Sequence, residues 1–285
     1  MSRIFYVNGS FVDEQDAKIS VLDRGFLFAD AVYEVSSVLN GKLIDNRAHL
    51  ARLHRSLTEL SMAPACSDEE LVSSQQRLLQ LNQLKEGLVY LQVSRGVADR
   101  DFAFPKDPKS SLVMFTQEVA LIDRPTAKTG IDVISVPDIR WARRDIKTVG
   151  LLAPSLAKQQ ALDAGAHDAW MVENGYVTEG TSNNAYIVHS DNVIQTRHLG
   201  NEILSGITRD AVLRFASEAG FTVLEEPFTV EQVKSASEAF FTSASAFVMP
   251  VVSMDGQSIG AGKPGPVSTR LRELYIDTAL QREDL

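Results

Sequence analysis

Lys147 is the residue whose surroundings most suggest covalent chemistry. It follows Arg143 and Arg144, and the apolar segment 149–153 comes shortly after it. Positive neighbours and apolar surroundings can lower the pKa of a lysine. A deprotonated amine is the nucleophile that forms Schiff bases with carbonyl groups. The alternative is an ordinary solvated lysine, since most lysines of a soluble protein lie at its surface.

Glu179 is a second candidate, because it lies among small hydroxyl and amide residues in segment 177–184. A carboxylate in such a loop accepts hydrogen bonds and can hold a nitrogen atom of a bound ligand. A loop acid beside the tight turn at Gly180 is the alternative interpretation of the same residues.

Two further segments are suited to binding an anion. Segment 204–209 places Gly206 and Thr208 at the start of a predicted helix, where free backbone N–H groups and the helix dipole favour negative charge. Segment 242–245 carries small hydroxyl residues at the end of a predicted strand. The alternatives are an ordinary N-cap at Thr208 and a simple turn at 242–245.

The elements that must position these residues include many hairpins. Asn-Gly and Asp-Gly dipeptides, which tolerate the positive φ angles of tight hairpin turns, lie between apolar runs at 8–9, 40–41, 174–175 and 255–256. Strands are predicted at 4–7, 88–93, 112–115, 131–136, 185–188, 221–224 and 239–242.

Helices interrupt the strands at irregular intervals. They are predicted over 46–62, 207–219 and 266–281, and Thr229 with Gln232 forms a capping box for a short one. In the first helix leucines form one face, and the opposite face carries Arg52, Arg55 and Glu59. This pattern favours an α+β fold. We expect a smaller N-terminal α+β domain over 1–120, a linker over 121–130 and a larger C-terminal domain over 131–285.

Composition and charge limit the class of protein. The 285 residues are 44% hydrophobic and 23% charged, as in soluble globular proteins, and the net charge of −9 argues against nucleic acid as a partner. No stretch approaches the length needed to span a membrane. The single cysteine, Cys66, excludes an intrachain disulfide, and the five histidines show no metal-ligand spacing. We expect a cytoplasmic protein without a metal site.

Several of these segments, taken together and in order, resemble the fold-type IV pyridoxal-phosphate enzymes. The resemblance covers nearly the whole chain and is closest to the D-amino acid (D-alanine) aminotransferases. It is carried by Tyr6-Val7-Asn8-Gly9, Val21–Phe26, Asp30–Val35, Lys147, the loop Glu179–Asn183 and the segment Leu204–Arg209. It implies a two-domain fold whose larger C-terminal domain binds pyridoxal 5′-phosphate.

The resemblance also implies a role for each matching residue. Lys147 would form the Schiff base with the cofactor and carry a proton between the substrate Cα and the cofactor C4′. Glu179 would pair with the pyridine nitrogen and keep it protonated, which makes the ring a better electron sink. Leu204 would pack on the ring face. The remaining cofactor contacts, mainly to the phosphate, would come from Arg52, Ser182, Ile207, Thr208, Ser243 and Ala244.

For the substrate, the resemblance implies a carboxylate site made of Tyr33 and, from a neighbouring subunit, Arg100. Phe102 stands where the family has a histidine, so one donor of the carboxylate site is missing. The implied enzyme is a homodimer that transfers an amino group between a D-amino acid, such as D-alanine, and a 2-oxo acid, such as 2-oxoglutarate. The alternatives on the same fold are a branched-chain L-amino acid transaminase, an (R)-amine transaminase and an aminodeoxychorismate lyase.

Overall fold

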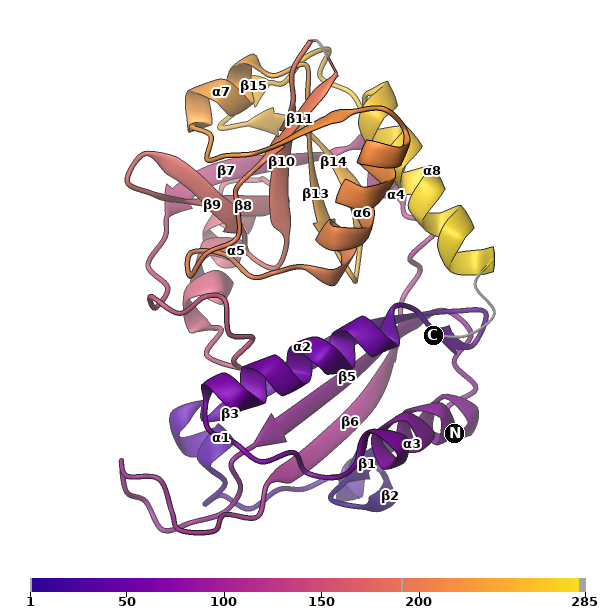
Figure 1. The fold of residues 1–285 in the computed structure, drawn as a ribbon, viewed down its shortest axis with the longest axis vertical. Helices are drawn as coiled ribbons and strands as arrows, with labels where there is room; N and C mark the ends of the chain where they lie inside the picture. The colour runs from indigo at the N-terminus through magenta and orange to yellow at the C-terminus, as the bar shows by residue number, and fades with distance from the viewer. Residues whose placement is uncertain (1, 191, 282–285) are drawn as a thin grey trace. The chain divides into compact units, whose positions relative to one another are not determined.

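The computed structural model describes residues 2–190 and 192–281, which form two compact units (Figure 1). Unit 1 comprises residues 2–120 and 146–150, and unit 2 comprises 121–145 and the described part of 151–281. Two segments therefore differ from the domain boundaries expected from the sequence. Segment 121–130 belongs to unit 2, and segment 146–150, with Lys147, belongs to unit 1. The fold is mixed α and β, as expected.

Unit 1 is built on a six-stranded antiparallel sheet with the order β2-β1-β6-β5-β3-β4. Its strands are β1 (Ile4–Val7), β2 (Ser10–Asp13), β3 (Ala31–Leu39), β4 (Lys42–Leu43), β5 (Gly87–Ser94) and β6 (Ser111–Glu118). Its helices are η1 (Glu14–Asp16), α1 (Arg24–Phe28), α2 (Asn46–Glu59) and α3 (Asp68–Leu81).

Helices α2 and α3 cover the sheet of unit 1, with α2 against β3 and α3 against β1 and β6 (Figure 1). The leucine face of α2 packs into a core with Leu78 of α3 and Leu91 and Met114 of the sheet. This confirms the predicted apolar face of α2. The segment 146–150 adds Ile146 to the same core and is tied to β3 by a bridge between Val32 and Thr148.

Unit 2 contains a nine-stranded mixed sheet, in which β12-β11-β10-β13-β14-β7-β8-β9 follow one another and β15 pairs with β14. Its strands are β7 (Ile131–Pro137), β8 (Asp168–Glu173), β9 (Tyr176–Gly180), β10 (Asn184–Val188), β11 (Val193–Thr196), β12 (Thr222–Glu225), β13 (Glu238–Ser243), β14 (Phe247–Met254) and β15 (Gln257–Ser258). Its helices are α4 (Pro125–Thr129), α5 (Leu152–Asp163), α6 (Ile207–Glu218), α7 (Val230–Ser235) and α8 (Pro266–Gln281).

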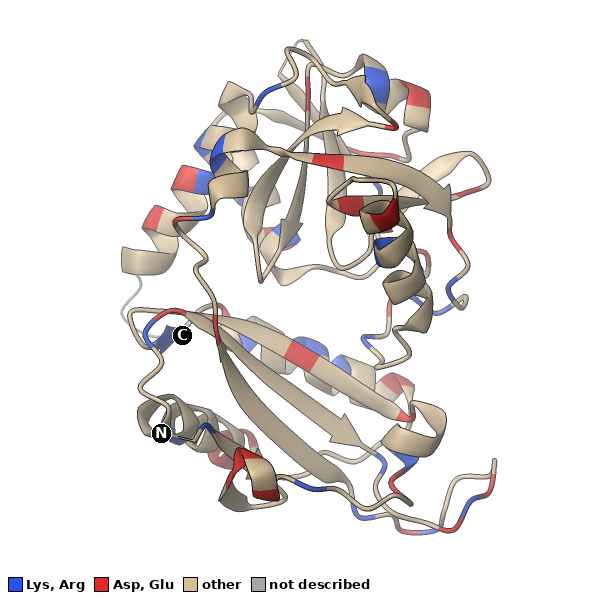
Figure 2. Cartoon of the chain, turned by 180° about the vertical axis from the view of Figure 1, so that it is seen from behind, with Lys and Arg blue, Asp and Glu red and all other residues tan. Residues whose placement is uncertain are grey.

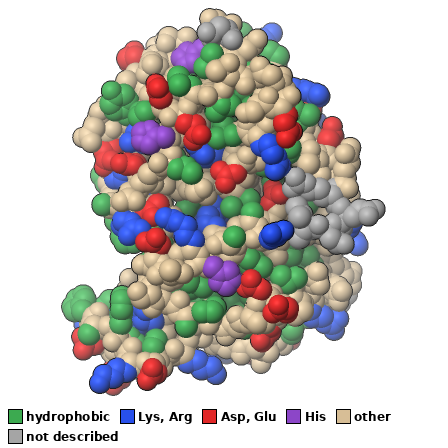
Figure 3. All heavy atoms as spheres, in the orientation of Figure 1, with side chains coloured by type: hydrophobic (Ala, Val, Ile, Leu, Met, Phe, Trp, Pro, Cys, Tyr) green, Lys and Arg blue, Asp and Glu red, His purple; other side chains and the backbone are tan. Residues whose placement is uncertain are grey.

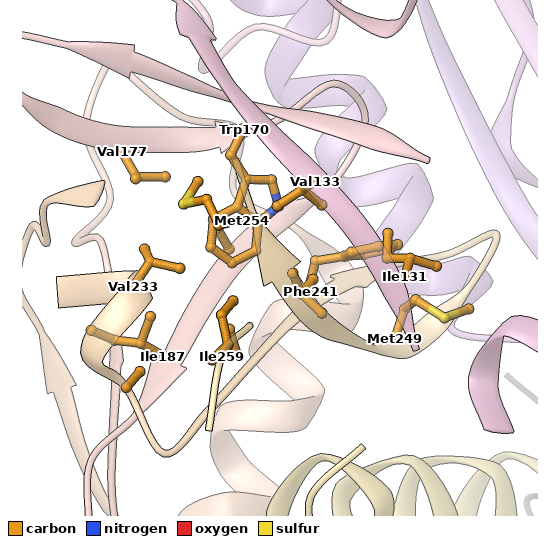
Figure 4. Close-up of a cluster of buried hydrophobic side chains, with 14 of the residues drawn as sticks. Ile131, Val133, Trp170, Val177, Ile187, Val233, Phe241, Met249, Met254 and Ile259 are labelled. Carbon is orange, nitrogen blue, oxygen red and sulfur yellow. The ribbon is translucent and has the colours of Figure 1, made fainter. Parts of the chain in front are cut away.

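The core of unit 2 fills the space between these strands and helix α7 (Figure 4). Trp170, Val177 and Ile187 are fully buried there, beside Phe241 and Met254 of the β13–β14 hairpin. Removing this apolar area from water is the main term that stabilises the unit. The core thereby holds the hairpin, whose turn, residues 243–247, lies at the end of the sheet.

All four predicted glycine turns are confirmed, because each dipeptide connects two paired strands. The capping box of Thr229 and Gln232 is also confirmed. In both units Lys and Arg are interspersed with Asp and Glu (Figure 2). Within the described residues no helix is long and apolar enough to cross a bilayer.

Candidate active site

Lys147 lies on the short segment that runs beside β3. Tyr33 N donates to the Lys147 carbonyl at 3.0 Å, and Lys147 N donates to Ser56 Oγ at 3.4 Å. The Lys147 Nζ lies 4.1 Å from the centroid of the Tyr33 ring, within the range of a cation–π contact. Unit 1 thus brings together the predicted nucleophile and the tyrosine predicted to bind the substrate carboxylate.

The Tyr33 ring is itself held by an aromatic stack across the sheet. It stacks on Tyr90 at 5.6 Å, Tyr90 stacks on Phe115 at 4.8 Å, and Phe115 stacks on Phe5 at 5.3 Å. Cross-strand aromatic pairs of this kind stabilise a sheet and restrict the rings to one orientation. The stack therefore fixes the surface over which the Lys147 amine lies.

The arginines that precede Lys147 in sequence are each bonded to an acid. Arg143 pairs with Asp145 at 3.0 Å, and Arg144 makes two hydrogen bonds to Glu173 at 2.6 and 2.9 Å. Their charges are thus compensated by neighbouring carboxylates. These pairs give no support to the prediction that the two arginines activate Lys147, and the contact observed is with Tyr33.

Arg52, predicted on the polar face of its helix, is instead buried, with 9% of its surface exposed. Its Nε and Nη2 donate to the two oxygens of Glu34 at 2.8 and 2.7 Å, and His49 Nδ1 lies 2.8 Å from the same carboxylate. Burial raises the pKa of Glu34, but the charge and hydrogen bonds of Arg52 and His49 outweigh it and hold that pKa at about 2. The predicted bidentate edge of Arg52 is therefore engaged by Glu34, and a role toward phosphate remains a prediction.

Arg100 lies on the exposed loop between β5 and β6. Hydrophobic side chains gather over this loop (Figure 3), where Phe102 and Phe104 are 80% and 60% exposed. The Arg100 guanidinium lies 5.4 Å from the Phe28 ring and 5.7 Å from the Phe102 ring. Buried Arg24 fixes the loop by donating to the carbonyls of Asp101 and Ala103 at 2.6 and 3.3 Å.

Glu179 is the centre of a buried polar network in unit 2. It lies at the end of β9 with 5% of its surface exposed. Asn184 Nδ2 and the Leu204 backbone N–H donate to Glu179 Oε2 at 3.0 and 3.2 Å, and Arg140 Nη1 donates to Oε1. Burial raises the pKa of the Glu179 carboxyl, and the charge of Arg140 offsets this only in part.

Arg140 belongs to this network although it was not predicted from the sequence. Its guanidinium is shared between two acids, because Nε and Nη2 donate to Asp138 at 3.0 and 2.6 Å while Nη1 bonds Glu179. Thr178 Oγ1 donates to Asp138 at 2.7 Å and completes the group. Arg140 therefore orients Glu179 from one side, and it is the one charged group that donates to Glu179 among the described residues.

Asn184, at the end of the segment around Glu179, joins the predicted cofactor residues of unit 2. Besides Glu179, its Nδ2 bonds the Leu204 carbonyl at 2.9 Å, and its Cα pairs with Thr242 in the sheet. A Cβ added to Gly206 would lie 2.1 Å from Asn184 Oδ1, so only glycine fits there. Asn184 thus links Glu179, Leu204, the start of α6 and the strand that leads to Ser243.

Helix α6 begins beside this asparagine, and its N-cap residue makes no side-chain cap hydrogen bond. Gly206 is its N-cap, so the alternative interpretation of Thr208 as N-cap is wrong. Thr208 is buried in the first turn with 3% of its surface exposed, next to Ile207. The first turn of α6 therefore offers its backbone N–H groups and dipole to an anion.

The turn that follows Glu179 is anchored by Asp168. This buried carboxylate accepts from Thr181 Oγ1 at 2.6 Å and from Asn183 Nδ2 at 2.8 Å. Ser182, between them, is exposed. The anchored turn leaves the Ser182 side chain available to a ligand.

The donor set of unit 2 fits pyridoxal phosphate. Glu179 is a buried carboxylate with partly compensated charge, which suits a protonated ring nitrogen. The first turn of α6 and the Ser243–Ala244 turn provide the kind of N–H and hydroxyl donors that bind phosphate. The role of Lys147, which belongs to unit 1, remains a prediction. No feature of these residues conflicts with the cofactor.

Comparison with known proteins agrees with this chemistry. Residues 31–254 match the family of class IV amino-transferases. A D-alanine aminotransferase of Staphylococcus aureus (strain N315) is 40% identical over 276 residues, which is 96% of this chain and 96% of that protein. The D-alanine aminotransferase of Bacillus licheniformis is 37% identical over 278 residues, 98% of this chain and 96% of that protein.

Solved structures with the same fold are branched-chain amino acid aminotransferases. The T.th. enzyme with pyridoxamine 5′-phosphate matches with a TM-score of 0.90 at 27% identity, over 99% of this chain and 96% of that chain. The Escherichia coli enzyme matches with a TM-score of 0.91 at 24% identity, over 98% and 95%. The chain therefore belongs to the class IV amino-transferases, the fold-type IV enzymes that use pyridoxal phosphate.

Proposed function

We propose that this enzyme transfers an amino group between a D-amino acid, such as D-alanine, and a 2-oxo acid, such as 2-oxoglutarate. The observation that carries the chemistry is the buried Glu179 carboxylate, whose pKa is raised and which has one charged donor, Arg140, within the described part of the chain. The support for D-amino acids is the 40% identity to a D-alanine aminotransferase over 96% of the chain.

Pyridoxal phosphate, when bound, supplies the electron sink for the carbanion that forms at the substrate Cα. Lys147 would hold the cofactor through its amine, and its Nζ would take the proton from the substrate Cα and return it on the cofactor side. The Tyr33 ring, 4.1 Å from that Nζ, would limit the positions that the amine reaches. Positioning of this kind lowers the barrier to proton transfer.

Glu179 would accept the N–H of the pyridine ring and keep it protonated. Arg140 and Asn184 hold the carboxylate in one orientation, so little reorganisation is needed when the cofactor binds. Leu204 would pack on the ring, and Ser182 would add a polar contact. The phosphate would be held by the first turn of α6 with Ile207 and Thr208, by Ser243 and Ala244, and by Arg52.

The substrate carboxylate would be bound by Tyr33 and by Arg100 of a second subunit. An arginine offers a bidentate edge to a carboxylate. Arg100 is exposed and lies on a loop with exposed apolar residues, which suits contact with a second chain. We therefore propose a homodimer. We place it in the cytoplasm, where a protein with one free cysteine, Cys66, suits the reducing conditions.

The test combines spectroscopy and product analysis. We expect the purified protein with pyridoxal phosphate to show a visible absorbance band that Lys147→Ala lacks. Incubation with D-alanine and 2-oxoglutarate should yield pyruvate, whereas L-alanine should yield far less. A protein that forms no such band, or that turns over L-alanine as fast as D-alanine, contradicts the proposal.

A second candidate is transamination of branched-chain L-amino acids or of (R)-amines. It is favoured by the structural likeness to the T.th. branched-chain enzyme and by the apolar Phe102, which stands where the resemblance to D-amino acid aminotransferases implies a histidine. L-leucine and a small (R)-amine should be tested beside D-alanine. An aminodeoxychorismate lyase would instead release its products without any amino acceptor.

A further inference from the structure

Phe247 adopts a backbone conformation that an aromatic residue rarely takes. Its φ is +58°, in the left-handed region that favours glycine and asparagine. It closes the β13–β14 hairpin turn, in which Ala246 N donates to the Ser243 carbonyl at 3.3 Å, and its side chain is fully buried. A strained position of this kind persists only where the surrounding structure holds it.

Arg272 of helix α8 supplies the contacts that hold this strained turn. Its Nη1 donates to the carbonyls on both sides of Phe247, to Ala246 at 2.7 Å and to Val248 at 3.0 Å. Its guanidinium also lies 5.7 Å from the Phe247 ring, and Tyr275 of the same helix packs against that ring at 5.0 Å. The strained residue is therefore clamped on its backbone and on its side chain by α8.

The burial of Arg272 is unusual because its guanidinium donates to backbone carbonyls. Only 8% of its surface is exposed, and its Nη2 donates to the carbonyls of Leu121 and Ile122 at 2.5 and 3.1 Å. Burial, with the nearby charge of Arg124, lowers its pKa to about 10. Neutral carbonyls compensate a buried charge less well than a carboxylate does. These contacts are therefore better suited to fixing the backbone around Phe247 than to stabilising the fold.

The turn that Arg272 clamps is the one that contains Ser243 and Ala244. The strand that leads into the turn pairs with Asn184, the residue bonded to Glu179. We infer that Arg272 is a positioning residue that holds the Ser243–Ala246 turn in the conformation that binds the cofactor phosphate. This inference rests on the phosphate site of the proposed function. The competing interpretation is that Arg272 only joins α8 and residues 121–122 to the sheet.

The two interpretations differ in whether replacing Arg272 weakens cofactor binding only when the cofactor carries its phosphate. We would measure the affinities of the apoenzyme for pyridoxal phosphate and for pyridoxal, which lacks the phosphate, by quenching of tryptophan fluorescence. Arg272→Met should weaken binding of pyridoxal phosphate by about tenfold or more and that of pyridoxal by less than about threefold. Arg272→Lys, which keeps the charge with fewer fixed donors, should show the same selective loss in smaller measure.

Ser268→Ala is the matched control, because it weakens the same helix–hairpin contact at the opposite end of β13. Ser268 Oγ donates at 2.8 Å to Glu238, which begins β13, whereas the turn follows the other end of that strand. This variant should change both affinities equally. The melting temperature of each apoenzyme with and without inorganic phosphate gives a second readout. Phosphate should stabilise the wild type and Ser268→Ala more than either Arg272 variant.

Equal losses of both affinities in the Arg272 variants, or no loss, would overturn the assignment of Arg272 and leave the phosphate site intact. If Arg272→Met does not fold, Arg272→Lys decides by the same ratio of affinities. A wild-type enzyme that binds pyridoxal as tightly as pyridoxal phosphate would overturn the phosphate site itself, and the role of Arg272 with it.

Discussion

Glu34 in unit 1 and Glu179 in unit 2 are both buried carboxylates beside an arginine, yet their pKa values move in opposite directions. Glu34 is 2% exposed and Glu179 is 5% exposed. Burial raises the pKa in both cases, but arginine and histidine bring that of Glu34 down to about 2, whereas that of Glu179 stays above its ordinary value. Burial alone therefore does not decide the state of a carboxylate.

The difference lies in how each arginine divides its donors. Arg52 gives both Nε and Nη2 to Glu34, and His49 adds a contact. Arg140 gives Nε and Nη2 to Asp138 and only Nη1 to Glu179. Glu34 is thus compensated within its own unit and serves the structure. Glu179 is compensated in part and is suited to one further cationic partner, as functional carboxylates often are.

The largest expected effect is on the stability of unit 1. Glu34→Gln leaves the buried Arg52 without its carboxylate, which should lower the free energy of unfolding by about 3–5 kcal/mol. Urea denaturation of the apoenzyme measures it. The control is Glu14→Gln, which breaks the exposed pair with Arg3 and should cost less than about 1 kcal/mol. Equal effects of the two substitutions would show that Glu34 has no special structural role.

For Glu179→Gln we expect the reverse of the effect of Glu34→Gln, namely a large loss of turnover with little loss of stability. Arg140 keeps both bonds to Asp138, so the apoenzyme should lose little stability. Turnover should fall by about 10²–10³-fold, the range for loss of one electrostatic contact in an active site, while pyridoxal phosphate stays bound. Glu173→Gln, which alters the partly exposed pair with Arg144, is the control and should keep its turnover. Full activity of Glu179→Gln would remove the contrast between the two acids.

Local signals in the sequence were sufficient for much of the fold. The Asn-Gly and Asp-Gly turns and the capping box depend on neighbouring residues alone, and all were found. Helix α5 was not predicted, because it buries the small Pro154, Ala157 and Ala161 and exposes its leucines. Its apolar pattern therefore points away from the core, and periodicity cannot identify its buried face.

The sequence singles out candidate site residues but does not predict their surroundings. Lys147 and Glu179 stood out in sequence, yet the contact of Lys147 is with Tyr33 and not with the arginines beside it in the chain. Helical periodicity places Arg52 on the polar face and cannot reveal its burial, because its partner Glu34 lies on another element. Arg140 and Asn184 acquire their positions only when distant strands pair, so no local pattern marks them.

The pH dependence of stability should separate the two carboxylates again. The pKa of Glu34 is about 2 when folded, below its ordinary 4.5, so its contribution is complete above about pH 4.5 and is lost as the pH falls toward 2. The pKa of Glu179 is raised, so folded apoenzyme binds its proton more tightly and loses stability as the pH rises above 4.5.

Urea unfolding from about pH 3 to pH 8 would show both changes in stability, the loss at low pH and the decline above pH 4.5. Glu34→Gln should flatten the loss on the acid side, and Glu179→Gln should remove the decline on the other side. If Glu179→Gln leaves the profile above pH 4.5 unchanged, the carboxylate is already compensated and cannot be the partner reserved for a ring nitrogen.

The smallest expected effect concerns the hydrogen bonds that hold Glu179, the acid whose pKa is raised. Asn184→Ala removes hydrogen bonds to Glu179 and to the Leu204 carbonyl, which should cost about 1–3 kcal/mol of stability. Gln195→Ala removes a buried amide of β11 that bonds His189 and the Pro227 carbonyl, and should cost a similar amount. Only Asn184→Ala should also weaken binding of pyridoxal phosphate, measured by fluorescence quenching. If Gln195→Ala weakens it equally, then general stability of the unit controls cofactor affinity, and the orientation of Glu179 does not.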